Sequence, residues 1–128
     1  MIFKQTWLSI ADNTNVRWMQ VFQLYKGFHR TVTTIGFFIK GSARVVEPPR
    51  IEYKGFKFKF NRKGDICRGF IVRTKCVALN ADGCAFSFFS NDTILLKKKQ
   101  EPKSKFVHGA VSCKLRRKKF LLLFPSVV

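Results

Sequence analysis

The stretch Lys63-Gly-Asp-Ile-Cys-Arg-Gly-Phe-Ile-Val-Arg-Thr-Lys75 decides the expected fold, because it predicts a turn followed by a buried strand. Lys63-Gly64-Asp65 is typical of a turn, since glycine tolerates positive φ and aspartate can hydrogen-bond its own backbone. β-Branched and aromatic residues dominate the run from Ile66 to Val72, which is typical of a strand covered on both faces. We therefore expect this strand at the centre of a small β-barrel, with Arg68, Arg73 and Lys75 placing charge at its two ends and so at the rim of the barrel.

Apolar alternation outward from this stretch predicts the other strands. We expect strands over residues 2–10, 16–25 and 32–46 before it, and over residues 84–89 and 93–96 after it. In residues 16–25 the apolar side chains fall on both faces, which predicts burial on both. Asp82-Gly83 predicts a tight hairpin turn over residues 80–83.

Residues 51–61 contain a strict alternation of phenylalanine and lysine. Phe56, Phe58 and Phe60 share one face, while the intervening lysines share the other. We expect a projecting ribbon with an apolar side and a side suited to phosphate, whose partner the sequence does not identify. An edge strand whose lysines only deter aggregation would show the same pattern.

The periodicity changes after Pro102. Val107, Ala110, Val111 and Leu115 recur at three-and-four spacing, which predicts a short helix that begins near Gly109. The chain is long enough for one compact domain over residues 1–128. The expected fold is mainly β: a small barrel over about residues 1–100 with a projecting ribbon, then a short helical region over about residues 103–128.

The charge balance restricts the function classes. Lysine and arginine number 25 against 7 acidic residues, so the net charge is +18, and such an excess repels itself in a compact chain. A polyanion is therefore the expected partner, with nucleic acid favoured because its phosphates bind cations and release counterions. An anionic membrane surface is the main competitor. No apolar run approaches the roughly 20 residues of a membrane span.

Side chains with catalytic or metal-binding chemistry are scattered along the chain. Cys67, Cys76, Cys84 and Cys113 form no C-x-x-C pair, so we expect free and mostly buried thiols rather than a metal site or disulfides. His29 and His108 are isolated in the sequence. We expect no enzyme activity, no cofactor and no small-molecule substrate; a thiol-dependent enzyme would require a cysteine of low pKa.

Short motifs in a fixed order carry a resemblance to a known family. They are Met1-Ile2, Gln5-Thr6, Ala11-Asp12-Asn13, Gly27, His29-Arg30, Ile35-Gly36, Pro49-Arg50, Lys63-Gly64-Asp65, Val72-Arg73-Thr74-Lys75, Asp82-Gly83, Leu95-Leu96, Gly109, Val111, Leu115-Arg116 and Lys119-Phe120. Each motif alone is weak, but their order and spacing extend over nearly the whole chain. The sequence resembles the universal large-subunit ribosomal protein number fourteen.

The resemblance implies a five-stranded barrel that is a structural constituent of the large ribosomal subunit. It also implies binding to large-subunit ribosomal RNA, and contact with small-subunit RNA across the subunit interface beside large-subunit protein number nineteen. The family usually has glycine where this chain has Asn15, and asparagine is the next-best residue for a left-handed turn.

Basic residues near turns and in charge clusters are the predicted RNA-binding residues, since arginine in particular binds phosphate with two donors. They are Arg17, Lys26, His29, Arg30, Arg44, Arg50, Lys63, Arg73, Lys75, Lys97, Lys98, Arg116, Arg117, Lys118 and Lys119. Affinity would come from charge neutralisation, and A-form RNA would be recognised by its backbone shape.

A second function remains open at this point, a free-standing barrel that binds single-stranded nucleic acid. It would need aromatic rings on the basic face, on which bases could stack. Abundant phenylalanine and the excess of lysine over arginine, with no added targeting segment, favour synthesis in an AT-rich organelle. We expect a mitochondrial location, with a plastid or a bacterial cytoplasm as the alternatives.

Overall fold

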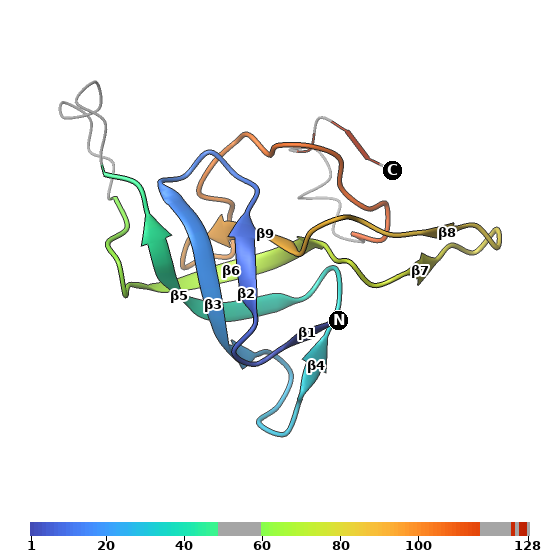
Figure 1. Ribbon diagram of the computed structural model, residues 1–128, viewed down its shortest axis with the longest axis horizontal. Coiled ribbons are helices and arrows are strands. Elements are labelled where there is room, and N and C mark those ends of the chain that lie inside the picture. Colours follow the sequence, from blue (N-terminus) through green and yellow to red (C-terminus); the bar gives the residue numbers. More distant parts are fainter. Residues whose placement is uncertain (49–59, 116–123, 125, 128) are drawn as a thin grey trace.

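The computed structural model describes residues 1–48, 60–115, 124 and 126–127, and its centre is a closed five-stranded barrel (Figure 1). The barrel strands are β2 (Trp7–Ile10), β3 (Val16–Leu24), β5 (Phe38–Val46), β6 (Ile66–Arg73) and β9 (Asp92–Leu96). They neighbour one another in the order β2-β3-β5-β6-β9, and parallel pairing of β2 with β9 closes the otherwise antiparallel barrel. The mainly β fold predicted from the sequence is confirmed.

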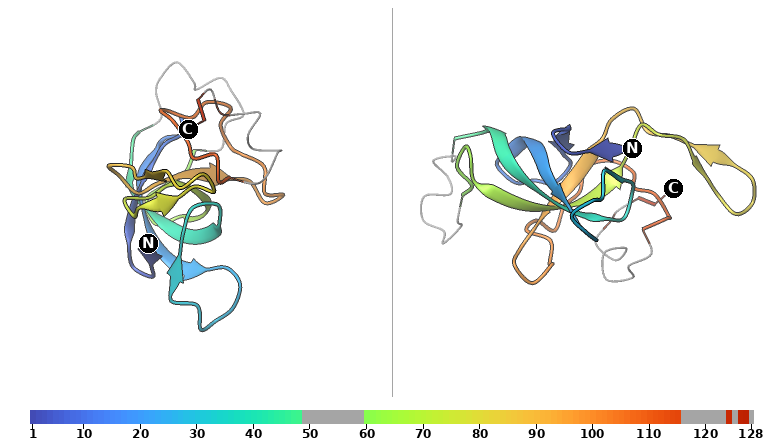
Figure 2. Two further views of the ribbon diagram at one scale, coloured as in Figure 1. Left: turned by 90° about the vertical axis from the view of Figure 1, so that its right-hand side faces the viewer. Right: turned by 90° about the horizontal axis from the view of Figure 1, so that it is seen from below.

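Two small sheets flank the barrel. One pairs β1 (Ile2–Phe3) with β4 (Val32–Thr33), and the other pairs β7 (Ala78–Leu79) with β8 (Ala85–Phe86) in a ribbon that extends away from the barrel (Figures 1 and 2). The predicted hairpin turn is confirmed, since the Asn80 N–H donates to the Cys84 carbonyl at 2.8 Å. The ribbon predicted over residues 51–61 falls almost entirely on residues outside the described ranges.

Two expected strands are each divided by a turn. Residues 2–10 form β1 and β2, and the break contains Gln5 at φ 71°. Residues 32–46 form β4 and β5, and the break contains Gly36 at φ 86°, whose N–H donates to the Ile71 carbonyl at 3.0 Å. A left-handed residue reverses the chain direction locally, so the predictions of single strands were wrong at these points.

Strand β6 is buried on both faces, as its apolar run predicts. Ile71 packs inside the barrel with residues of β2, β3 and β5. Phe70, on the other face, packs in a second cluster with Val111 and Leu115 from the C-terminal part of the chain. The first residue of the strand departs from the prediction, because Ile66 is 74% exposed. Burial of the outer face of β6 therefore depends on the C-terminal part of the chain, which packs on the barrel from outside.

Strand β3 is buried on one face, against the prediction. Trp18 and Phe22 are exposed, while Met19, Val21 and Leu24 are buried. The pairing of β3 with β5 shifts register between Val21 and Gln23 and at two places nearer the start of the strand. A bulge changes which side of the sheet the following residues face, so the simple alternation fails.

The described C-terminal residues contain no helix, so the helix prediction was wrong over residues 103–115. Gly109 has φ 80°, and the carbonyls of His108 and Ala110 accept hydrogen bonds from Arg73 instead of from helical N–H groups. An extended bridge from Asp12 to Val107 helps to hold the segment on the barrel.

Within the described ranges, no helix is long and apolar enough to span a membrane.

The turn at Asn15 is preserved without a left-handed residue there, since Asn15 is not among the described residues with positive φ. Its side-chain amide instead donates to the Asn61 carbonyl at 2.8 Å, and the Asn61 N–H donates to the Asn15 Oδ1 at 3.3 Å. The asparagine thus ties the turn before β3 to the chain that leads into β6.

Candidate nucleic-acid interface

A row of cations crosses the outer surface of the barrel. The basic stripe, as we call it, consists of Lys40, Arg68, Lys97 and Lys98. Lys40 on β5 is the register partner of Arg68 on β6, and Arg68 is in turn the partner of Leu96, which immediately precedes Lys97. The Arg68 Nη1 donates to the Lys98 carbonyl at 2.7 Å. Strand pairing thus brings together cations from three separate parts of the sequence.

The stripe lacks carboxylate partners. Within residues 1–48 and 60–115, ion pairs join carboxylates to Arg17 and Arg73 and to no cation of the stripe. Like charges directly opposite one another on neighbouring strands, such as Lys40 and Arg68, destabilise a sheet. An external anion would remove this repulsion, so the surface is suited to a polyanion.

The loop after β3 holds cations against aromatic rings. Lys26 has φ 75° and Gly27 has φ 117°, a combination that turns the chain sharply. The Lys26 Nζ lies 4.9 Å and the Arg30 guanidinium carbon 4.4 Å from the centre of the Phe37 ring. Cation–π attraction therefore keeps both charges near the surface of the barrel while leaving them accessible to an anion.

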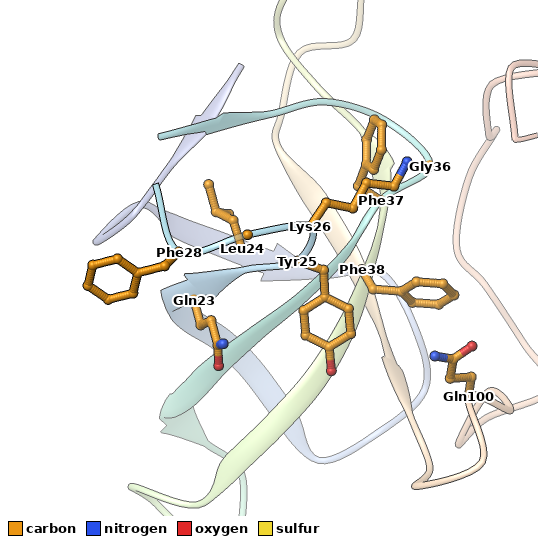
Figure 3. Close-up of a pocket in the computed structure, with 10 residues that line it drawn as sticks. Gln23, Leu24, Tyr25, Lys26, Phe28, Gly36, Phe37, Phe38 and Gln100 are labelled. Carbon is orange, nitrogen blue, oxygen red and sulfur yellow. The ribbon is translucent and has the colours of Figure 1, made fainter. Parts of the chain in front are cut away.

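A hollow of about 570 Å³ opens beside the stripe (Figure 3). We call it the Tyr25 hollow; it is lined by Gln23, Leu24, Tyr25, Lys26, Gly27, Phe28, Gly36, Phe37, Phe38 and Gln100. The Lys40 Nζ lies 5.7 Å from the centre of the Tyr25 ring, so the stripe and the hollow share this edge. Aromatic rings and cations are thus combined on one face.

Four further predicted residues are described by the structure and do not belong to the stripe. His29 is exposed and makes an edge-to-face contact with Phe28, in the loop that also carries Arg30. Arg44 on β5 and Lys63 in the turn before β6 are exposed, and Lys75 is exposed between β6 and the β7–β8 ribbon. The other predicted residues lie outside the described ranges: Arg50, Arg116, Arg117, Lys118 and Lys119.

Two predicted arginines bind carboxylates of the chain itself. Arg17 pairs with Glu47 at 2.6 Å, and both side chains are about 40% exposed. Arg73 pairs with Asp92 at 2.6 Å, with side-chain exposures of 13% and 5%. Arg73 therefore has the environment of a structural residue, and its binding to RNA stays a prediction.

Three cations near this face were not among the predicted RNA-binding residues: Lys4, Lys40 and Arg68, of which Arg68 was expected only as a charge at the end of its strand. The Lys4 Nζ lies 5.3 Å from the centre of the Phe28 ring, and Lys40 and Arg68 belong to the stripe. None of them belongs to a charge cluster in the sequence. The pairing register of β5 with β6 places Lys40 and Arg68 side by side, and no local sequence pattern shows that register.

The cysteines are free within the structure, but most are accessible, against the prediction of mostly buried thiols. Cys67 is buried inside the barrel, Cys76 is half-buried, and Cys84 and Cys113 are exposed. Burial raises the pKa of the Cys67 thiol, which lowers its thiolate fraction at neutral pH.

We expect iodoacetamide at pH 7.5 to modify Cys84 and Cys113 first and to leave Cys67 unmodified in the folded protein. Peptide mass spectrometry over a time course measures the order of modification. Unfolding in guanidinium chloride should make all four thiols react at similar rates, which serves as the control. Modification of Cys67 as fast as Cys84 in the folded protein would contradict the buried position.

The fold and this surface together define a class, a small basic β-barrel protein whose charge is suited to a polyanion. The chain belongs to the ribosomal protein L14p/L23e family, whose family model matches residues 1–126. It is therefore a structural constituent of the large ribosomal subunit. The resemblance inferred from the sequence is confirmed.

Proposed function

We propose that this chain binds large-subunit ribosomal RNA through the basic stripe and the neighbouring loop that carries His29 and Arg30. The observation that carries the proposal is the Lys40–Arg68 cross-strand pair, which has no carboxylate partner among the described residues. Cations held by strand register have a fixed spacing, which suits recognition of an RNA backbone by its shape. Arg44, Lys63 and Lys75 would extend the contact to neighbouring phosphates.

The salt dependence of RNA binding tests this proposal. Roughly six phosphate contacts should give log K a slope of about −4 to −5 against log salt concentration. We expect Lys40→Gln/Arg68→Gln to reduce the magnitude of that slope by about 1.4–1.8. Fluorescence anisotropy with a blunt 16-base-pair RNA duplex, measured from 50 to 300 mM KCl, would give both values.

A charge-matched control separates the stripe from net charge. Lys103→Gln/Lys105→Gln removes two charges elsewhere, and the Lys103 Nζ is hydrogen-bonded to the Asn61 side chain at 2.8 Å. This variant should bind the duplex with nearly the wild-type slope. Equal losses in the two double variants would mean that overall charge, rather than the stripe, determines binding.

The position in the ribosome is a further part of the proposal. We propose that the chain lies at the subunit interface, where it contributes to a bridge with small-subunit RNA beside large-subunit protein number nineteen. A mitochondrial ribosome is the proposed source, supported by the high phenylalanine content and the excess of lysine over arginine. Chemical crosslinking of purified mitochondrial ribosomes, read by mass spectrometry, would test the partners and the source together.

One observation favours the second candidate, a free-standing protein that binds single-stranded nucleic acid. Such a protein needs aromatic rings on its basic face, and Tyr25, Phe28 and Phe37 border the Tyr25 hollow beside the stripe. Sedimentation of a cell or organelle lysate distinguishes the two functions. Travel with the large subunit through a sucrose gradient supports the ribosomal function, whereas recovery in the light fractions supports the alternative.

A further inference from the structure

We infer that the Tyr25 hollow takes the base of an unpaired nucleotide of ribosomal RNA, while the basic stripe holds the adjoining phosphates. This inference rests on the proposed RNA binding and adds a specific kind of contact to it. Backbone recognition needs only cations, whereas a hollow walled by aromatic rings among those cations is the arrangement that binds unstacked bases.

The size of the hollow and the aromatic rings around it support a base as the occupant. Its volume of about 570 Å³ falls within the usual range of small-ligand sites, about 300–1,000 Å³. In Figure 3, Phe28 stands at one edge, Phe38 and Gln100 lie at the other, and the Tyr25 ring lies between them. Phe28 is 86% exposed and makes no part of either core cluster. An exposed ring beside cations adds little to the core, and it is available to stack on a base.

A second hollow of about 250 Å³ adjoins the first one at Phe28. It is lined by Lys4 and Phe22 together with four residues that also line the Tyr25 hollow. The exposed Phe28 ring therefore lies between two recesses, each with a lysine in its lining. Bases and phosphates alternate along single-stranded RNA, so a ring with a lysine in the recess on each side offers contacts to both.

Competition between cation and base for the ring faces decides whether a base can enter. An exposed cation–π contact, such as that of Lys40 with Tyr25, contributes about 2- to 5-fold to an equilibrium constant. Stacking of one base on an aromatic ring contributes about 5- to 150-fold to affinity. The base therefore displaces the ammonium group from the ring, and the released lysine can bind the phosphate beside that base.

Polar groups at the rim are available to the edge of a base. Within the described residues, the side-chain amides of Gln23 and Gln100 and the Tyr25 hydroxyl form no hydrogen bond with the protein. Figure 3 shows the Tyr25 ring between these two glutamines. An amide offers both a donor and an acceptor, as recognition of a Watson–Crick edge requires.

The test compares two RNA probes on the full chain: an eight-nucleotide oligoadenylate and the blunt 16-base-pair duplex. We expect Tyr25→Leu to weaken oligoadenylate binding by about 5- to 150-fold, while duplex binding changes by less than about 2-fold. Tyr25→Phe keeps the ring and should retain most of the affinity. Because Tyr25 also packs against the second core cluster, thermal unfolding of each variant is measured first.

Phe28→Leu supplies a variant without a core contact, and it should also weaken binding of the oligoadenylate selectively. Phe89→Leu is the matched control, since Phe89 is 102% exposed and lines neither hollow. If Tyr25→Leu and Phe28→Leu both bind the oligoadenylate as tightly as the wild type does, the inference is overturned. The proposed RNA binding would remain intact. An equal loss in Phe89→Leu would also overturn the inference. Failure of the wild type to bind either probe would instead remove the proposed function.

Discussion

Arg73→Met should lower the free energy of unfolding by about 3–5 kcal/mol, because it leaves the buried Asp92 carboxylate without its counter-ion. The Arg73 Nε donates to the Asp92 Oδ2 at 2.6 Å, and the Nη1 donates to the carbonyls of His108 at 2.7 Å and Ala110 at 3.1 Å. One guanidinium therefore joins β6, β9 and the C-terminal segment. Urea denaturation followed by circular dichroism would measure the change.

The backbone at Gly109 is adapted to this guanidinium. A Cβ atom at Gly109 would lie 2.5 Å from the Arg73 Nη1, and the φ of 80° is unfavourable for other residues. Asp92 also accepts hydrogen bonds from the hydroxyls of Ser9 and Ser90. The carboxylate and the guanidinium are thus each satisfied by several partners, which is the condition under which a buried ion pair is well tolerated.

Arg17→Met is the matched control for Arg73→Met. The Arg17–Glu47 pair has the same 2.6 Å separation but lies at the surface, and exposed pairs contribute about 0–1 kcal/mol. A double-mutant cycle with Asp92→Asn isolates the interaction between Arg73 and Asp92. Equal, small losses in Arg17→Met and Arg73→Met would contradict the structural role of Arg73.

Phe70→Ala should lower the free energy of unfolding by about 3–5 kcal/mol, the usual range for removal of a buried phenylalanine. Phe70 is fully buried on the outer face of β6, where it contacts Phe38 with ring centres 5.3 Å apart. It belongs to the cluster that holds Val111 and Leu115 on the barrel. The variant should therefore lose both stability and the attachment of the C-terminal segment.

Amide hydrogen exchange distinguishes these two effects of Phe70→Ala. Exchange should accelerate at Val111 and Leu115 more than at Val21, which lies in the barrel interior. Phe89→Ala is the control, because removal of a fully exposed ring is expected to change stability by less than about 0.5 kcal/mol. Uniform acceleration across the whole chain would mean that the two core clusters unfold as a single unit.

The β character of the chain and two of its turns were predictable from local signals, whereas the five strands of the barrel followed from the family resemblance. The turn at Gly64 and the hairpin turn at residues 80–83 both occur where glycine and aspartate predict them. The doubly buried run in β6 also matches the sequence pattern. These features depend on residues close together in the chain, which is why periodicity and turn chemistry were sufficient.

The C-terminal segment was not predictable in the same way. Its three-and-four spacing of apolar residues fits a helix, yet Arg73 takes the carbonyl groups that a helix would use. Arg73 lies more than thirty residues earlier in the sequence, as the 35-residue separation from His108 shows. A long-range hydrogen bond of this kind has no signature in a local pattern.

The sequence by itself determined that this protein is a basic β-barrel of the L14p/L23e family, because composition, turn residues and ordered motifs are properties of the chain alone. Only the tertiary structure decided which cations share a face. Strand register placed Lys40 beside Arg68, with Lys40 also against the Tyr25 ring, and it buried Arg73 against Asp92. The physical reason is that cross-strand neighbours are set by pairing between distant segments, and a shift of one residue would turn each side chain to the opposite face.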